Sequence, residues 1–195
     1  MIEIHGICFK EPFPQEIKWN AEDLYFAISH FPQGQLVAEV EGIAAGQIIS
    51  NRVSEELYRS HPPLVEFIGI DPPWYRFDEA GSTLWILEIA VDPSFSGRGA
   101  ALALIQACKV AVTDTHGLTR FGAGARIPGY AAWKEKTGAT AQAYCQGVAK
   151  GEIFDPVLGP FLKYGTRFDR VVPGYVADPE SLDYGASVIW ERGMD

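Results

Sequence analysis

Cysteine is scarce in this chain of 195 residues, with only Cys8, Cys108 and Cys145. The three are odd in number and far apart, they form no C-x-x-C pair, and no histidine spacing completes a zinc site. We therefore expect reduced thiols, with no disulfide framework and no metal centre. No stretch approaches about 18 uninterrupted apolar residues, and no basic region precedes an apolar segment at the N-terminus. These absences argue against a membrane span and a secretory signal, so we expect a cytoplasmic protein.

Basic residues are also few, with 16 Lys and Arg against 25 Asp and Glu, a formal net charge of −9. Nucleic acids and anionic membranes are bound by neutralising phosphates with Lys and Arg, so the balance argues against both partners. The charge is unevenly spread. Residues 95–170 hold 10 basic and 5 acidic residues, a net of +5, which leaves −14 for the remainder. The first window suits a local anion site, and the remainder suits a cationic small molecule.

Several catalytic and nucleotide-binding motifs are missing as well. The chain has no Gly-x-x-x-x-Gly-Lys-Ser/Thr, no His-Glu-x-x-His and no Gly-x-Ser-x-Gly. The glycines of 122–127 lack the third glycine of a dinucleotide-binding motif and lie in an expected strand. No internal repeat is present, and the length predicts one domain over 1–195.

The apolar patterns predict alternating strands and helices. A strand, a helix and a second strand in succession indicate a right-handed crossover with parallel strands, hence an α/β fold. Expected helices cover 20–31, 54–59, 100–113, 130–136, 141–150 and 155–165, and expected strands cover 35–40, 47–53, 84–91, 118–127, 167–172 and 186–191.

The most informative stretch runs from the strand 84–91 through a glycine turn into the helix 100–113. Gly97 and Gly99 allow close backbone approach, the first helical turn offers free N–H groups, and Arg98 adds a positive charge. This arrangement is typical of a pyrophosphate site. A plain tight connection between strand and helix explains the same glycines, and the local sequence leaves both interpretations open.

The segment Val91-Asp-Pro-Ser-Phe-Ser-Gly-Arg-Gly-Ala-Ala101 resembles the acyl-CoA pyrophosphate loop of the GNAT superfamily of N-acetyltransferases. The Gln/Arg-x-x-Gly-x-Gly/Ala pattern of that loop falls on Ser96, Gly99 and Ala101. Ser96 departs from the usual Gln or Arg at a position that contributes chiefly its backbone N–H. Further segments resemble the GNAT subgroup often fused to a carbon–nitrogen hydrolase domain, namely 31–42, 125–130, 150–158 and 173–181.

The resemblance implies a mixed, mostly antiparallel sheet flanked by helices, whose two central parallel strands part to seat acetyl-CoA. A helical insert at 128–154 is expected over the acceptor side. Backbone groups near the thioester are implied for Ile89, Ala90 and Val91, beside a bulge, and phosphate contacts for Ser96, Gly97, Arg98, Gly99, Ala100 and Ala101. Asp155 falls where the family often has a cofactor-contacting Asn; with Pro156 after it, a helix N-cap is the alternative.

Glu88 is the only charged residue in 84–91 and is expected just before that bulge. It is a candidate general base, and an ion pair with Arg126 or an exposed rim position are the alternatives. Phe161 falls where the family usually has a tyrosine acid, so Tyr130 and Tyr164 are candidate substitutes, with a buried aromatic as the alternative for each. The four histidines lie near the ends of expected elements and are expected at the surface.

The implied activity is that of an enzyme, an N-acetyltransferase. It would transfer acetyl from acetyl-CoA to a primary amine of a small cationic substrate by direct attack in a ternary complex. Two alternatives are a non-catalytic acyl-CoA binding or regulatory module, and an S-acyltransferase or decarboxylase of the GNAT-like loading-domain type. The implied partners are acetyl-CoA and a small-molecule amine. Because domains of this family often dimerise, a homodimer is an alternative to the monomer.

Overall fold

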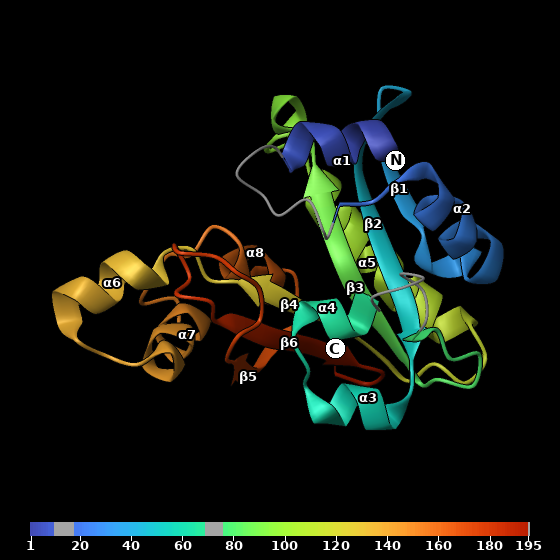
Figure 1. The fold of residues 1–195 in the computed structure, drawn as a ribbon. Coiled ribbons are helices and arrows are strands. Elements are labelled where there is room, and N and C mark those ends of the chain that lie inside the picture. The colour runs from blue at the N-terminus through green and yellow to red at the C-terminus, as the bar shows by residue number, and fades with distance from the viewer. Residues whose placement is uncertain (10–17, 69–75, 195) are drawn as a thin grey trace.

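A computed structural model describes residues 1–9, 18–68 and 76–194. Its centre is a six-stranded sheet with the order β1-β2-β3-β4-β6-β5 (Figure 1). Every neighbouring pair is antiparallel except β3 and β4, which are parallel, as predicted. The strands are β1 (Leu36–Val40), β2 (Ile43–Val53), β3 (Thr83–Val91), β4 (Arg120–Arg126), β5 (Arg167–Val172) and β6 (Gly185–Glu191).

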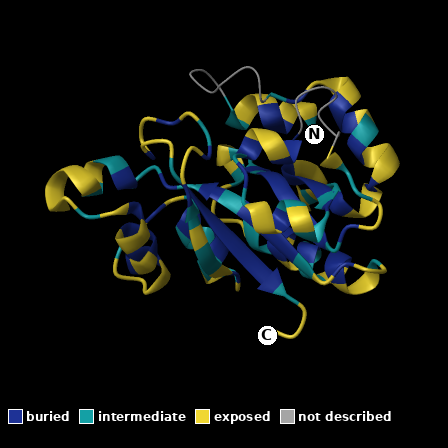
Figure 2. Ribbon diagram, turned by 60° about the horizontal axis from the view of Figure 1, so that its bottom comes forward, coloured by how far each residue is buried: buried dark blue, intermediate teal, exposed yellow. Residues whose placement is uncertain are grey.

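Helices cover both faces of the sheet, with α5 behind the strands and α4 in front of them in Figure 1. The core under α5 is completed by α7 and α8, and the core on the opposite face is built with α2, α3 and α4. Figure 2 shows buried strands and helices that are exposed on their outer sides. No described helix is both long and apolar enough to cross a membrane. The helices are α1 (Ile2–Cys8), α2 (Ala21–His30), α3 (Glu55–Ser60), α4 (Leu64–Ile68), α5 (Ala100–Asp114), α6 (Tyr130–Thr137), α7 (Ala141–Ala149) and α8 (Leu158–Lys163).

Local signals set most of these boundaries. The side chain of Asn20 accepts hydrogen bonds from the first turn of α2, and Ser54 caps α3 in the same way. Glu41 and Gly42 both have positive φ, at 54° and 79°, and turn β1 into β2. The second strand of this hairpin begins at Ile43 rather than at Gln47. The sequence analysis missed α1 and α4, which have seven and five residues.

The two central strands pair over less than half of β3. Their register runs only from Thr83 opposite Arg120 to Ile86 opposite Ala123. Beyond that point β3 continues to Val91 beside β2, and β4 continues to Arg126 beside β6. The predicted parting of the parallel strands is therefore confirmed. Beyond Ile86 and Ala123, the facing edges of β3 and β4 are not paired with each other.

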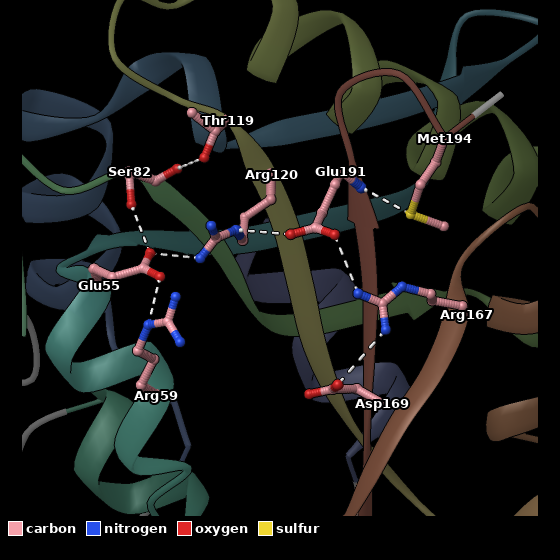
Figure 3. Close-up of polar contacts among 9 residues, drawn as sticks. All are labelled: Glu55, Arg59, Ser82, Thr119, Arg120, Arg167, Asp169, Glu191 and Met194. Carbon is pink, nitrogen blue, oxygen red and sulfur yellow. Dashed lines mark hydrogen bonds and ion pairs between the residues drawn. The ribbon is translucent and has the colours of Figure 1, made fainter.

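An ion-pair network lies at the other end of β3 and β4, where the two strands are still paired (Figure 3). Arg120, at the start of β4, contacts Glu55 of α3 at 2.5 Å and Glu191 of β6 at 3.4 Å. Arg167 of β5 contacts the second oxygen of Glu191 at 3.1 Å, and Ser82, before β3, donates to Glu55 at 3.2 Å. The network therefore links the ends of β3, β4, β5 and β6 where the parallel strands are still joined.

Two glycines of β4 are required by close packing. A Cβ on Gly122 would lie 2.7 Å from the Trp85 ring, and a Cβ on Gly124 would lie 2.3 Å from the Tyr175 ring. The Tyr175 hydroxyl also donates to the Gly124 carbonyl at 3.0 Å. These glycines admit aromatic rings against the sheet, which explains the motif at 122–127 without a nucleotide.

Replacement of Arg120 by Gln is expected to lower the free energy of unfolding by about 1–3 kcal/mol at pH 7, because charge-assisted hydrogen bonds are lost. Burial raises the pKa of Glu55, but the hydrogen bond and charge of Arg120 outweigh it and leave this pKa below its usual value. The difference between wild type and variant should therefore stay constant above about pH 5 and shrink as pH falls through the lowered value. Urea unfolding between pH 3 and 8 tests this, and a difference independent of pH would contradict it.

Replacement of Gly124 by Ala is expected to cost about 1–3 kcal/mol of unfolding free energy, because the new Cβ collides with Tyr175. Gly159 in α8 is the matched control, since no atom lies within 4 Å of a Cβ built there. Gly159→Ala should be neutral or stabilising by up to about 1 kcal/mol. Thermal unfolding of both variants measures the contrast, and equal effects would disprove the packing role of Gly124.

Candidate active site

An extra residue in β3 decides where Glu88 points. In the pairing with β2, Ile86 lies opposite Ser50 and Glu88 lies opposite Ile49, so Leu87 has no partner and forms a β-bulge. Ile86 and Ile89 both face the core under α5, whereas Leu87 belongs to the core on the opposite face. The bulge therefore turns Glu88 to the same face as Leu87. It precedes Glu88, and our expectation that it would follow Glu88 is wrong.

Three side chains converge on the carboxylate of Glu88, which is only 6% exposed. His5 Nδ1 lies 2.5 Å from Oε2, and Trp19 Nε1 donates to the same oxygen at 2.9 Å. Gln47 Nε2 donates to Oε1 at 2.6 Å. Gln47 lies two residues from Ile49, which is opposite Glu88 in β2, so the Gln47 side chain points to the same face of the sheet as Glu88.

The structure excludes both alternative positions for Glu88. Its side chain is buried rather than at an exposed rim. Arg126 does not pair with it, but contacts Asp178 at 2.8 Å and Glu180 at 3.3 Å in the loop before β6. Burial raises the pKa of Asp178, but Arg126 and Ser181 outweigh it and hold this pKa below its usual value.

The sequence analysis missed all three partners of Glu88, and His5 is the ionisable one among them. It is 4% exposed, which corrects the expectation of a surface histidine. It lies on α1, a helix that packs across β2 and β3, and it is separated from Glu88 by 83 positions. Its only local signal is a polar residue within an apolar segment, Ile2-Glu-Ile-His-Gly-Ile-Cys8, and that signal does not name a partner.

A cavity of about 110 Å³ opens beside this cluster, between the parted strands. Within the described parts of the chain, the charged or ionisable residues of its wall are His5, Glu88, Arg126 and Tyr175. Most of the remaining wall is apolar. The described residues that complete it are Phe9, Trp19, Leu64, Ile68, Ile86, Leu87, Ile89, Gly124, Val157, Phe161 and Val176.

A second, apolar groove of about 220 Å³ lies on the other side of β3, between α5 and α8. Ile89, Val157 and Phe161 line both the groove and the cavity, so the two spaces share a wall at the parting. The groove also includes Ala101, in the first turn of α5. A narrow chain laid in the groove would therefore run from the N-terminus of α5 to the Glu88 cavity.

The N-terminus of α5 has the geometry of an anion site. Gly97 and Gly99 have φ values of +77° and +84°, with open space where a Cβ would be. Gly99 is the N-cap residue, and no side chain caps the helix, so its first N–H groups have no protein partner within α5. Ser96 is exposed beside them, and Arg98 lies half exposed over the Phe95 ring.

The candidate proton donors are placed differently from one another. Phe161 is buried at the wall shared by groove and cavity, where its ring has no hydroxyl to offer. Tyr164 lines the groove. Tyr130 does not line the cavity; it is 2% exposed, and its hydroxyl donates to the Ala139 carbonyl at 3.4 Å. The structure therefore brings Tyr164 toward the parting and leaves Tyr130 in the core of the insert.

Asp155 organises the start of α8. Its Oδ1 accepts from the N–H groups of Val157 at 2.9 Å and Leu158 at 2.7 Å, as in a cap. Its Oδ2 accepts from the Tyr144 hydroxyl at 2.8 Å. Burial and then Asp155 raise the pKa of Tyr144. The N-cap residue of α8 is Val157, so Asp155 stabilises the turn before the helix and is not its N-cap; the cofactor contact stays a prediction.

The helical insert at 128–154 extends beside the sheet in Figure 1, where α7 packs on β5 and α8. None of its residues lines the Glu88 cavity, and its position over an acceptor stays a prediction. Within the described residues, no group of His, Cys, Asp and Glu side chains is arranged to hold a metal ion.

Comparison with known proteins identifies the family to which the chain belongs. A family model described as the acetyltransferase (GNAT) family matches residues 1–134, about two thirds of the chain. The chain belongs to this family. It is 32% identical over 193 residues to the uncharacterized N-acetyltransferase YkwB of Bacillus subtilis (strain 168), covering 98% of this chain and 83% of the relative.

Two further matches extend the comparison. The chain is 29% identical over 184 residues to the probable hydrolase YhcX of the same organism; this match covers 94% of the chain but only 35% of YhcX. The partial match is in line with the resemblance to hydrolase-fused domains. The structure of a GNAT-like decarboxylase, GphF, in complex with isobutyryl-CoA superposes with a TM-score of 0.74 at 21% identity, covering 97% of this chain and 92% of that one. At this identity the likeness shows the GNAT fold alone.

Replacement of Gly99 by Glu is expected to abolish stabilisation by acetyl-CoA. The new side chain has to adopt a φ near +84°, and its carboxylate lies where the phosphates would bind. A ligand at about 100 times its Kd adds roughly 2.7 kcal/mol to the free energy of unfolding, so acetyl-CoA is expected to raise the Tm of the wild type by several degrees. Gly138→Glu is the control, because Gly138 has a φ of +71° and open space at the end of α6. Equal thermal shifts for the two variants would refute the loop assignment.

Proposed function

We propose that this GNAT-family protein transfers an acetyl group from acetyl-CoA to the primary amine of a small substrate. One observation carries the proposal. The Glu88 cavity shares a wall, made of Ile89, Val157 and Phe161, with the apolar groove that extends to Ala101 in the uncapped first turn of α5. A CoA ester held by its pyrophosphate at Gly97–Ala101 would reach the parting through the apolar groove.

The proposed reaction is direct attack within a ternary complex. The amine nitrogen attacks the thioester carbonyl carbon, the new C–N bond forms, and the C–S bond breaks to release CoA. Backbone groups of Ile89, Ala90 and Val91 are the proposed partners of the thioester, since β4 no longer pairs with this part of β3. The buried cluster around Glu88 supplies the acid–base group that direct attack by an amine requires. Tyr164 is the proposed donor to the thiolate, because it lines the groove.

The proposed acceptor is small and cationic. A cavity of about 110 Å³ has room for a compact group rather than a long chain. Amines are protonated at neutral pH, and the net charge of −14 outside residues 95–170 favours their approach. The charge of Arg126 in the cavity wall is offset by Asp178 and Glu180.

Release of free CoA from acetyl-CoA, measured against polyamines, amino acids and aminoglycosides, tests the proposal. We expect turnover with at least one amine. Glu88→Gln should lower kcat by about 10²-fold or more, because the cluster that performs acid–base catalysis loses its negative charge. Glu135→Gln, on the exposed surface of α6, is the matched control and should leave turnover unchanged.

The same assay separates the alternatives. Tight acetyl-CoA binding without turnover on any amine would favour a non-catalytic acyl-CoA binding module. Carbon dioxide release from malonyl-CoA, without amine-dependent CoA release, would favour a decarboxylase of the loading-domain type. Either result would contradict the proposed acetyl transfer.

A further inference from the structure

Two buried side-chain atoms of the cluster, His5 Nε2 and Gln47 Oε1, have no hydrogen-bond partner in the described part of the chain. Of these, His5 Nε2 belongs to a ring whose Nδ1 faces Glu88. The ring lines the cavity between the parted strands. A buried polar atom without a partner costs free energy, so its presence at a cavity wall calls for a ligand that would pair with it.

We propose that His5 Nε2 accepts the proton of the attacking amine, and that Glu88 positions the imidazole rather than taking the proton itself. The inference rests on the proposed acyl transfer and assigns the proton to one atom of that site. The other two donors to Glu88, Trp19 and Gln47, fix the carboxylate and thereby the ring.

The contact with Glu88 selects the tautomer of the ring. In the proposed arrangement Glu88 is the carboxylate that accepts from Trp19 and Gln47. A carboxylate only accepts hydrogen bonds, so Nδ1 would carry the hydrogen in the contact with His5. In the neutral ring, Nε2 is then the bare nitrogen with its lone pair available. The negative charge of Glu88 also stabilises the imidazolium that forms when Nε2 takes a proton.

Glu88 itself is poorly placed to receive the proton. Its Oε2 already accepts from His5 and Trp19, and its Oε1 accepts from Gln47. A proton arriving at either oxygen would compete with a donor already in contact. Among the residues that the structure describes, the ionisable groups that face His5 across the cavity are Glu88 on β3, Arg126 on β4 and the Tyr175 phenol. Arg126 is held by Asp178 and Glu180, which leaves Glu88 as the charge in contact with the ring.

A protonated amine has no lone pair, so the substrate first releases one proton to water and reacts as the neutral amine; the remaining steps balance without another reactant. As the amine nitrogen bonds to the thioester carbon, one N–H proton passes to His5 Nε2. The C–S bond breaks, and its electron pair leaves on the CoA sulfur. Tyr164, the proposed donor, gives its hydroxyl hydrogen to that thiolate and takes the proton from Nε2 in its place, so the neutral ring and the phenol are both restored.

The kinetic test uses the full chain with acetyl-CoA and the amine that gives turnover. His5→Asn keeps an amide donor near the position of Nδ1 and removes Nε2. We expect it to lower kcat by about 10²-fold or more while the KM for acetyl-CoA and its thermal shift stay unchanged. In His5→Ala, added imidazole should restore part of the lost rate, whereas Glu88→Gln should not respond to imidazole. His116→Asn, at an exposed position after α5, is the control.

A turnover within threefold of wild type in His5→Asn would overturn the assignment to His5 and leave the proposed acyl transfer standing. Absence of turnover with every amine would overturn both. A His5→Ala variant that folds, shown by its acetyl-CoA thermal shift, but gains nothing from imidazole would also contradict the inference.

Nitrogen-15 NMR of the four histidines tests the ring without any acceptor. At pH 8 we expect His5, identified by the signal lost in His5→Asn, to carry its hydrogen on Nδ1 and to leave Nε2 bare. A ring protonated on Nε2, or on both nitrogens, would overturn the inference whatever the enzyme assay gives.

Discussion

The extra residue in β3 is the constraint on which the site depends. Strand residues alternate between faces, so without the bulge at Leu87 the side chain of Glu88 would share the face of Ile86 and enter the apolar core under α5. A buried carboxylate without partners is costly there. With the bulge, the side chain of Glu88 points to the opposite face, where His5, Trp19 and Gln47 contact it. Ile89 then faces α5 and lines the wall between the cavity and the groove.

The parting of β3 from β4 gives this arrangement its access. The strands are tied at one end by the ion pairs of Arg120 and are separated at the other, where Tyr175 packs on Gly124 and donates to its carbonyl. The gap between β3 and β4 therefore adjoins a binding space on each face of the sheet. The α5 face offers an apolar groove and an uncapped helix terminus, and the opposite face offers a small cavity with a buried carboxylate and imidazole.

Local sequence signals predicted the elements that position the site, but not all of its contacts. Alternation, caps and glycine turns identified β3, α5 and the loop between them, because these features depend on neighbouring residues. His5 lies 83 positions from Glu88 and Trp19 lies 69 positions away, and no local pattern pairs residues at such separations. Tyr130 followed a strand end as a catalytic residue would, yet packing against Tyr144 and Tyr184 holds it inside the insert.

A crystal structure of the protein with acetyl-CoA tests the central claim most directly, because it locates both ends of the cosubstrate at once. The account predicts the pyrophosphate on the backbone N–H groups of Gly97–Ala101, and the pantetheine arm in the groove between α5 and α8. It also predicts the thioester carbon at the parting beside Ala90, on the path to His5. A thioester that points away from the cavity, or a pyrophosphate bound elsewhere on the surface, would contradict it.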